Sequence, residues 1–283
     1  MIKGAKETMP ELPEVETIKR TLESLVIGKQ IEDVDVFWPK IIKNPPDVEA
    51  FTVMLKGQTI RSMGRRGKFI LFYLDDMTLV SHLRMEGKYG VYSSEQPKDK
   101  HTHVIFSFTD GSQLRYHDVR KFGTMHVFPK GEEMLHQPLN QLGPEPFSAE
   151  FTSFYLEEKI AKTTRNIKAV LLDQTIVTGL GNIYVDESLY RAQIHPERVA
   201  SSLDHGEVKK LHQAIIETLS EAVEKGGSTI RSYVNSQGQI GMFQLELNAY
   251  AQEGTPCKRC GTTIEKRKVA GRGTHFCPKC QRK

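Results

Sequence analysis

Near the start of the chain, apolar residues recur at steps of three and four. They are Leu12, Val15, Ile18, Leu22, Leu25 and Val26. This spacing predicts a helix with one apolar face, which Gly28 ends. Pro13 suits the first helical position because its missing N–H needs no partner there, and Glu14 and Glu16 suit the positive end of the helix dipole.

Residues 31–130 are dominated by short runs rich in β-branched and aromatic residues, the pattern of β-strands. The runs are 31–37, 58–63, 69–74, 78–83, 88–92, 103–108, 113–117 and 124–128. One helix at 47–56 interrupts them, and Asp75-Asp76 and Asp110-Gly111 supply hairpin turns. Because such short connections favour antiparallel pairing, we predict an antiparallel β-sandwich flanked by helices.

The pattern changes after residue 129. A Gly-Pro-Glu-Pro stretch at 143–146 has the composition of a linker, and helical patterns follow it at 149–161, 167–172, 182–192 and 206–225. Asp204 and Glu207 form a capping box at the start of the last helix. Residues 226–243 carry Gly, Ser, Asn or Gln at nearly every other position, which predicts a mobile loop. The chain is therefore expected to be α+β, with several domains.

The 283 residues suggest two or more domains, and 38% apolar with 26% charged residues is the composition of an ordinary globular protein. No apolar run is long enough to span a bilayer. Residues 1–8 lack the apolar core of a secretory signal, so we expect a cytoplasmic protein with no membrane partner. The net charge of +4 says little, but basic residues cluster at 61–68 and crowd residues 258–283. Such clusters are usually solvated surface, and only together with a metal motif do they make nucleic acid an equal alternative.

All four cysteines lie near the end of the chain in two CxxC pairs, Cys257, Cys260, Cys277 and Cys280. This spacing is typical of a structural zinc site with four thiolate ligands and no open position. Two disulfides or idle thiols are the alternative, which a reducing cytosol disfavours. Residues 262–268 and 273–276 fit the strands of a hairpin with residues 270–273 at its tip. Arg272, between two glycines at that tip, can approach a phosphate closely.

Two further motifs have both a structural and a chemical interpretation. Gly179-Leu-Gly-Asn182 predicts a turn between helices with Asn182 as the cap of the second, and such a turn can also bind phosphate through its N–H groups. Pro10 can simply precede a helix. If it is the mature N-terminus, it is instead a secondary amine that can form an iminium with an aldehyde carbon, and Glu11 beside it can act as acid or base.

Several motifs occur together in a fixed order along the chain. They are Met9-Pro-Glu-Leu-Pro-Glu14, Arg66-Gly-Lys68, His82-Leu-Arg-Met85-Glu-Gly, Asp118-Val-Arg-Lys-Phe-Gly123, Gly179-Leu-Gly-Asn-Ile-Tyr184 and the CxxC pairs. In this order they resemble bacterial formamidopyrimidine-DNA glycosylases, from Met9 to Lys283. The resemblance implies a base-excision repair enzyme that removes oxidised purines, notably 8-oxoguanine and formamidopyrimidines, and then nicks the abasic site by β,δ-elimination.

The resemblance also implies roles for individual residues. Pro10 matches the nucleophile that forms a Schiff base with the sugar C1′, Glu11 the adjacent acid or base, and Glu14 a supporting carboxylate. The groups that hold the phosphates around the lesion match Lys68, His82, Asn182, Tyr250 and Arg272. Lys68 is also implied in base release. The implied catalytic residues are Pro10, Glu11, Lys68 and Arg272.

The side chains that enter the duplex when the nucleotide leaves match Met85, Arg120 and Phe122. Extruding a base leaves a hole in the stack, which an apolar wedge and an arginine can fill. Considered without the resemblance, Met85 and Phe122 fit core residues, and His82 fits a histidine satisfied within a strand.

On this resemblance the chain has an N-terminal extension, a catalytic β-sandwich domain, a linker, a helix-two-turn-helix DNA-binding domain with a lesion-capping loop, and a zinc-ribbon finger. Their expected ranges are 1–8, 9–130, 131–146, 147–254 with the loop at 226–243, and 255–283. The implied partner is double-stranded DNA that contains oxidised purines or abasic sites. The implied cofactor is one structural zinc ion, and the implied state is a monomer.

Two rival interpretations remain at this point. Oxidised-pyrimidine glycosylases of the endonuclease VIII type share the proline, the glutamate and the zinc hairpin, but their start usually reads Pro-Glu-Gly-Pro-Glu, and here Leu12 replaces the glycine. The other rival is a DNA-damage-binding protein that its N-terminal extension inactivates. Ile2 is too bulky for the usual removal of Met1, and in a chain that keeps residues 1–8 the Pro10 nitrogen is an amide with no usable lone pair.

Overall fold

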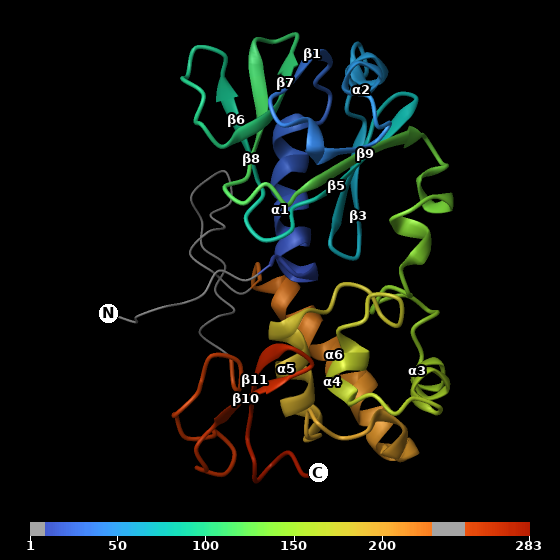
Figure 1. Cartoon of the computed structure of the whole chain (residues 1–283), viewed down its shortest axis with the longest axis vertical. Helices are drawn as coiled ribbons and strands as arrows, with labels where there is room; N and C mark the ends of the chain where they lie inside the picture. Colours follow the sequence, from blue (N-terminus) through green and yellow to red (C-terminus); the bar gives the residue numbers. More distant parts are fainter. Residues whose placement is uncertain (1–8, 228–246) are drawn as a thin grey trace. The chain divides into compact units, whose positions relative to one another are not determined.

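The computed structural model describes residues 9–227 and 247–283 of the chain (Figure 1). Residues 9–140 belong to one compact unit, and residues 141–227 with 247–283 belong to another. The expected extension at 1–8 and residues 228–243 of the predicted loop lie outside the described residues. The domain boundaries expected from the sequence remain a prediction.

The first unit contains two β-sheets. One has the strand order β1 (Ile31–Val36), β7 (Thr102–Phe108), β8 (Ser112–His117) and β6 (Lys88–Ser93). The other has the order β2 (Ile42–Asn44), β9 (Thr124–Pro129), β5 (Met77–His82), β4 (Phe69–Tyr73) and β3 (Ser62–Arg66). Neighbouring strands pair antiparallel except β2 with β9, which pair parallel. The predicted antiparallel sandwich is thus confirmed, with this one parallel edge as a departure.

Helix α1 (Leu12–Val26) supplies the centre of the first core (Figure 1). It contacts β3 and β4, and its buried Val15, Leu22 and Val26 belong to one apolar cluster with residues of both sheets. The helix has the predicted bounds, but Pro13 is its second residue because Glu11 is the N-cap. A shorter helix, α2 (Val48–Leu55), packs on β1 and β2, and a 3-10 turn, η1 (Pro39–Ile41), precedes β2.

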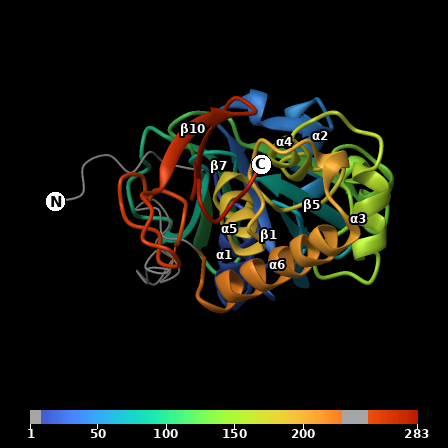
Figure 2. The same cartoon turned by 90° about the horizontal axis from the view of Figure 1, so that it is seen from below.

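The second unit is helical and ends in a hairpin. Its helices are α3 (Ser153–Ile160), α4 (Ile167–Leu171), α5 (Asn182–Ala192) and α6 (His205–Glu224), and its strands are β10 (Glu265–Val269) and β11 (Arg272–Phe276). Helix α5 contacts α4, α6 and β11, while α3 lies against α6 (Figure 2). The predicted capping box of α6 is present, with Glu207 N donating to Asp204 Oδ1 at 2.8 Å. Three further 3-10 turns are η2 (Glu133–Leu135), η3 (Leu139–Gln141) and η4 (Ala200–Ser202).

Three local expectations from the sequence are wrong. Strand β3 begins at Ser62 rather than residue 58, because the backbone before it bonds elsewhere. Thr59 N donates to Asp75 Oδ2, and Ile60 N donates to Lys29 O. The tip of the zinc hairpin is two residues long and not four. Ala270 and Gly271 have φ of 50° and 73° there, the left-handed pair that a tight hairpin turn requires, so Arg272 already belongs to β11.

The third error concerns the cap of α5, where Gly181 rather than Asn182 is the N-cap. The expected linker is also partly packed, since Gly143 N donates to Gln174 O at 2.8 Å and a Cβ at Gly143 would lie 2.6 Å from Thr175 O. In the described part of the chain, no helix is both long and apolar enough to cross a membrane.

Candidate functional site

Pro10 and Glu11 lie at the N-terminus of α1. Pro10 is buried, and Glu11 is 2% exposed and serves as the N-cap. Glu11 and Glu14 form a capping box, in which Glu11 N donates to Glu14 Oε2 at 3.0 Å. The supporting carboxylate expected from the sequence therefore fixes the backbone next to Pro10. The positive end of the helix dipole favours carboxylate groups at this position.

Lys68 lies on a turn that is tied to the same helix. Gly67, with φ of 56°, and Lys68 join β3 to β4, and Lys68 is only 8% exposed. Arg65, just before the turn, donates through Nε to Glu16 Oε2 of α1 at 3.1 Å and through Nη1 to Gly67 O at 3.0 Å. Burial raises the pKa of Glu16, but the positive charges of Lys19 and Arg65 lower it by more. The pKa of Glu16 therefore lies below its ordinary value, and the ion pair persists at neutral pH.

His82 ends β5 directly opposite Phe69 in the sheet register, and the two rings meet edge to face with centroids 4.5 Å apart. The side chain is buried. Burial first, and then the charges of Arg84 and Lys68, hold the pKa of His82 well below its ordinary value. Its Nδ1 accepts a hydrogen bond from Arg84 N at 2.9 Å. The ring is therefore neutral at pH 7, and its remaining proton lies on Nε2, which can donate to a ligand.

Two loops carry the predicted wedge residues. Met85 lies in the turn between β5 and β6, which Gly87 N closes by donating to Leu83 O at 3.0 Å. Arg120 and Phe122 lie in the loop between β8 and β9. A Cβ on Gly87 or on Gly123 would overlap the Tyr116 hydroxyl, so both loops pass against that group.

Side-chain contacts confirm that the two loops are neighbours. Arg120 Nε lies 4.0 Å from Glu86 Oε1 of the turn that carries Met85, and the Arg120 guanidinium lies 4.8 Å from the Phe122 ring centre. Phe122 is 52% exposed. An aromatic side chain held in water beside an arginine is suited to insertion into a base stack.

Asp118 fixes the shape of the loop between β8 and β9, and sequence reasoning assigned it no role. Its carboxylate is fully buried and accepts hydrogen bonds from Arg120 N, Phe122 N and Gly123 N, each at 2.9 Å. Its carbonyl oxygen lies 2.7 Å from His103 Nε2. An aspartate that accepts from N–H groups two to five residues later is a known turn-forming arrangement, which could have identified it.

In the second unit, Asn182 is the first residue of α5 and contacts the hairpin. Its Nδ2 donates to Gly273 O at 2.9 Å. Its Oδ1 is buried and has no hydrogen-bond partner among the residues that the structure describes. Since buried polar atoms normally have partners, this oxygen marks the N-terminus of α5 as a place where a ligand or water can bind.

Tyr250 is held by a buried acid of α5. The Glu187 carboxylate accepts from Asn248 N, Ala249 N and Tyr250 N at 2.8 to 3.1 Å. Burial raises the pKa of Glu187, while these backbone donors oppose the rise. The Tyr250 ring meets the His275 ring edge to face at 5.2 Å. Glu187 had no assigned role at the sequence level.

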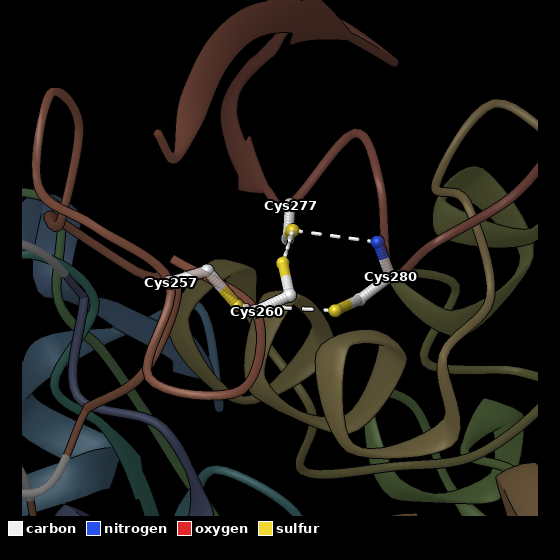
Figure 3. A group of neighbouring side chains, drawn as sticks. All are labelled: Cys257, Cys260, Cys277 and Cys280. Atoms are coloured by element: carbon white, nitrogen blue, oxygen red, sulfur yellow. Dashed lines mark hydrogen bonds between the residues drawn. The ribbon is translucent and has the colours of Figure 1, made fainter. Parts of the chain in front are cut away.

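The four cysteines come together at the base of the hairpin (Figure 3). Their sulfur atoms all lie within 4.8 Å of one another, with Cys257 to Cys280 at 3.9 Å and Cys260 to Cys277 at 3.5 Å. Zinc at about 2.3 Å from each sulfur of a tetrahedron would separate the sulfur atoms by about 3.8 Å. All four are free cysteines, so the disulfide alternative is wrong and the group fits zinc.

Tyr190 of helix α5 contacts the zinc-binding segment. The Tyr190 hydroxyl lies 3.2 Å from Cys257 Sγ. The Arg259 guanidinium lies 4.4 Å from the Tyr190 ring centre and donates to Tyr190 O at 2.7 Å. Such second-layer contacts orient metal ligands.

Three family models match the chain in succession. The formamidopyrimidine-DNA glycosylase N-terminal domain matches residues 9–125, and the formamidopyrimidine-DNA glycosylase H2TH domain matches residues 142–234. The zinc finger found in FPG and IleRS matches residues 254–282. This combination defines a class of zinc-containing DNA-repair glycosylases.

Individual proteins agree. The formamidopyrimidine-DNA glycosylase of Bacillus licheniformis is 64% identical over 275 residues, which are 97% of this chain and all of the relative, and that of Halalkalibacterium halodurans is 63% identical over 274 residues with the same coverage. A Lactococcus lactis FPG variant bound to Fapy-dG containing DNA superimposes with a TM-score of 0.91 at 44% identity, over 97% of this chain and all of that one. A complex of Lactococcus lactis Fpg with abasic-site DNA gives 0.90 at 44% identity, over 96% of this chain and all of that one.

The chain belongs to the formamidopyrimidine-DNA glycosylase family of base-excision repair enzymes. The family resemblance, the fold class and the structural zinc ion predicted from the sequence are confirmed. The roles of individual site residues remain predictions.

We expect Cys257→Ser to lose zinc while the β-sandwich and the helices stay folded, because the binding free energy of a structural zinc is largely the folding free energy of its own small module. Metal analysis by mass spectrometry measures zinc per chain, and circular dichroism follows the rest of the fold. Full zinc occupancy in this variant would contradict the four-cysteine site.

We expect Asp118→Asn to lower the free energy of unfolding by about 2 to 3 kcal/mol, because an amide cannot replace a buried carboxylate that accepts from three N–H groups. Urea unfolding measures this change. Lys121 of the same loop lies 4.1 Å from the ring centre of Trp38, the only tryptophan, so tryptophan fluorescence reports the order of the loop.

Asp99→Asn is the matched control. Asp99 also accepts a backbone N–H two residues later, from His101 at 2.7 Å, but in an exposed turn. This change should leave both the urea midpoint and the fluorescence almost unaltered. Equal effects of the two substitutions would show that Asp118 has no special role in the loop.

Proposed function

We propose that this chain is a monomeric, bifunctional DNA glycosylase that removes oxidised purines, notably 8-oxoguanine and formamidopyrimidines, from double-stranded DNA and then nicks the abasic site. The observation that carries the proposal is the placement of Pro10 and Glu11. Both are buried at the N-terminus of α1, where the Glu14 carboxylate accepts a hydrogen bond from Glu11 N and so fixes the backbone next to Pro10. Lys68 lies on a turn that Arg65 ties to the same helix.

The proposed chemistry uses the secondary amine of a chain that begins at Pro10. Its lone pair forms a bond to the sugar C1′ as the bond from C1′ to the base breaks, and the base leaves with that electron pair and takes up the proton that the amine nitrogen loses. The sugar ring then opens at C1′–O4′, with Glu11 giving a proton to O4′, and an iminium forms. Loss of a proton from C2′ expels the 3′ phosphate. Loss of a proton from C4′ then expels the 5′ phosphate in a second elimination.

Phosphate binding is assigned to five residues, Lys68, His82, Asn182, Tyr250 and Arg272. Lys68 and Arg272 supply positive charge, while neutral His82 donates through Nε2 and Tyr250 through its hydroxyl. Met85, Arg120 and Phe122 are assigned to the space that the extruded nucleotide leaves. Their two loops are neighbours, which supports a joint role in the duplex.

Residues 1–8 are proposed to be absent from the active form. The family model begins its match at residue 9, and all of the Bacillus licheniformis relative aligns within 275 residues, eight fewer than this chain has. Translation from Met9 exposes Pro10 once the methionine is removed.

We therefore expect protein that begins at Pro10 to nick 8-oxoguanine duplex and to be trapped on it covalently by borohydride. Protein that retains Met1 should bind the same duplex but should neither nick it nor be trapped, because its Pro10 nitrogen is an amide. Mass spectrometry of the intact chain verifies each N-terminus, and gel analysis measures nicking and trapping.

Pro10→Ala in protein that begins at residue 10 is the control. This variant keeps a terminal amine, but the amine is primary rather than secondary. Efficient trapping by verified Met1-retaining protein would show that Pro10 is not the nucleophile. If Met1-retaining protein binds the duplex and protein that begins at Pro10 shows no activity, the result would instead favour a damage-binding protein without catalysis.

The wedge assignment gives a separate prediction. Met85→Ala with Phe122→Ala should slow excision of 8-oxoguanine from duplex at least tenfold but slow cleavage at a preformed abasic site much less, because the second substrate needs less base extrusion. Single-turnover kinetics on both substrates measure the two rates. Val119→Ala is the matched control, since Val119 is 50% exposed in the same loop as Phe122, which is 52% exposed. Equal slowing on both substrates would remove the wedge role.

Oxidised pyrimidines are a second candidate substrate class. A structure of Lactococcus lactis Fpg with oxidised-pyrimidine DNA has a TM-score of 0.90 and 44% identity to this chain. Parallel excision assays on purine and pyrimidine lesions decide between the two classes. Faster excision of oxidised pyrimidines would overturn the purine assignment.

A further inference from the structure

A buried ion pair links helices α4 and α5 beside the zinc hairpin. Lys168 Nζ of α4 lies 2.6 Å from Asp186 Oδ1 of α5, and both side chains are 0% exposed. We infer that Asp186 is a positioning residue that fixes strand β11, and with it Arg272, on the helical domain. The inference about Arg272 rests on the proposed function, in which Arg272 binds a phosphate.

The contacts of Asp186 extend to the hairpin backbone. Asp186 Oδ2 accepts from His275 N at 2.9 Å. Two neighbouring donors reach the same strand, since Asn182 Nδ2 lies 2.9 Å and Lys168 Nζ 3.4 Å from Gly273 O. One acceptor and two donors from α4 and α5 therefore hold two alternate residues of β11.

This pattern matches the free edge of a strand. In an antiparallel pair, alternate residues direct both N–H and C=O away from the partner strand. Among the residues that the structure describes, this sheet has the two strands β10 and β11, and no further strand pairs with the outer edge of β11. Gly273 and His275 are alternate residues, and the Gly273 carbonyl and the His275 N–H bond to side chains of the helices instead. The side chains of α4 and α5 thus take the place of a third strand.

Zinc alone cannot fix Arg272. The zinc ligand Cys277 follows the last residue of β11, whereas Arg272 is the first. At about 3.3 Å per residue, Arg272 and Cys277 are about 17 Å apart along the strand direction. The contacts from Asp186, Lys168 and Asn182 lie between them. They therefore hold the part of the hairpin that the metal does not reach.

The energetics of buried ion pairs allow the positioning role to be separated from stability. Removing one partner leaves an uncompensated buried charge, whereas replacing both with apolar residues of similar volume is often neutral. Asp186→Asn is therefore expected to lower stability. Lys168→Met with Asp186→Leu is expected to keep the unfolding temperature while it removes two of the three anchors of β11. This double variant is the informative one.

The experiment uses the full chain beginning at Pro10, with zinc bound. Hydrogen exchange measures protection of the His275 amide, and fluorescence anisotropy measures affinity for duplex that carries a tetrahydrofuran abasic analogue. In the double variant we expect exchange at His275 to rise at least tenfold, with zinc content unchanged. Affinity should fall about as far as in Arg272→Ala, and adding Arg272→Ala to the double variant should lower it less than twofold further.

Glu221→Gln is the matched control. Glu221 also forms an ion pair with α5, through Arg191 Nη2 at 2.6 Å, but it is partly exposed and does not contact the hairpin. This change should leave the His275 exchange and the DNA affinity as they are in the parent protein.

Unchanged exchange at His275 in the double variant would overturn the inference. An affinity loss that persists in full when Arg272 is already alanine would also overturn it, since Arg272 would not be the group positioned. If the parent protein fails to bind the abasic duplex at all, the proposed function fails, and the exchange result still decides whether Asp186 holds β11.

Discussion

Buried carboxylates that accept backbone N–H groups fix the segments on which the proposed DNA contacts depend. Glu14 holds the backbone at Glu11, beside Pro10. Asp118 holds the loop with Arg120 and Phe122, Glu187 holds the segment that ends at Tyr250, and Asp186 holds the strand that begins at Arg272. Irregular segments have few apolar contacts of their own, so a buried charged acceptor supplies the missing order. Asp118 and Glu187 each gather three backbone N–H groups, while Glu14 accepts from Glu11 N and Asp186 from His275 N.

The burial of these acids also suits the proposed recognition of a polyanion. A carboxylate on the DNA-facing surface would repel phosphates, but one that is buried and saturated by N–H groups orders the loop while its charge is largely neutralised by its donors. The exposed positions can then be basic or aromatic, as Arg120, Phe122 and Arg272 are. Because the loops are ordered before DNA binds, less conformational entropy is lost on binding.

The fold and the zinc site could be predicted from sequence because their signals are local. The apolar period of α1 and the CxxC spacing each lie within a short window. Asp118 also acts within its own turn, so its pattern was within reach of sequence reasoning. Asp186 and Glu187 could not be found in this way, because they act on distant backbone groups that any residue supplies. Glu187 and Tyr250 are 63 residues apart. The errors at Asn182 and at the hairpin tip have a related cause. A helix or strand can gain or lose one residue at its end with little change in local propensity, so the sequence does not determine these boundaries to the residue.

The two interpretations of the N-terminal proline are compatible. Glu11 caps α1, so Pro10 is the first residue outside the helix and faces the positive end of its dipole. In the proposed form that begins at Pro10, a positively charged amine at this position is disfavoured by the dipole, whereas the neutral amine has the lone pair that attack on C1′ requires. The carboxylates of Glu11 and Glu14 oppose this effect but can accept and return protons. The helix start that explains the sequence structurally is thus also a suitable setting for an amine nucleophile beside its acid and base.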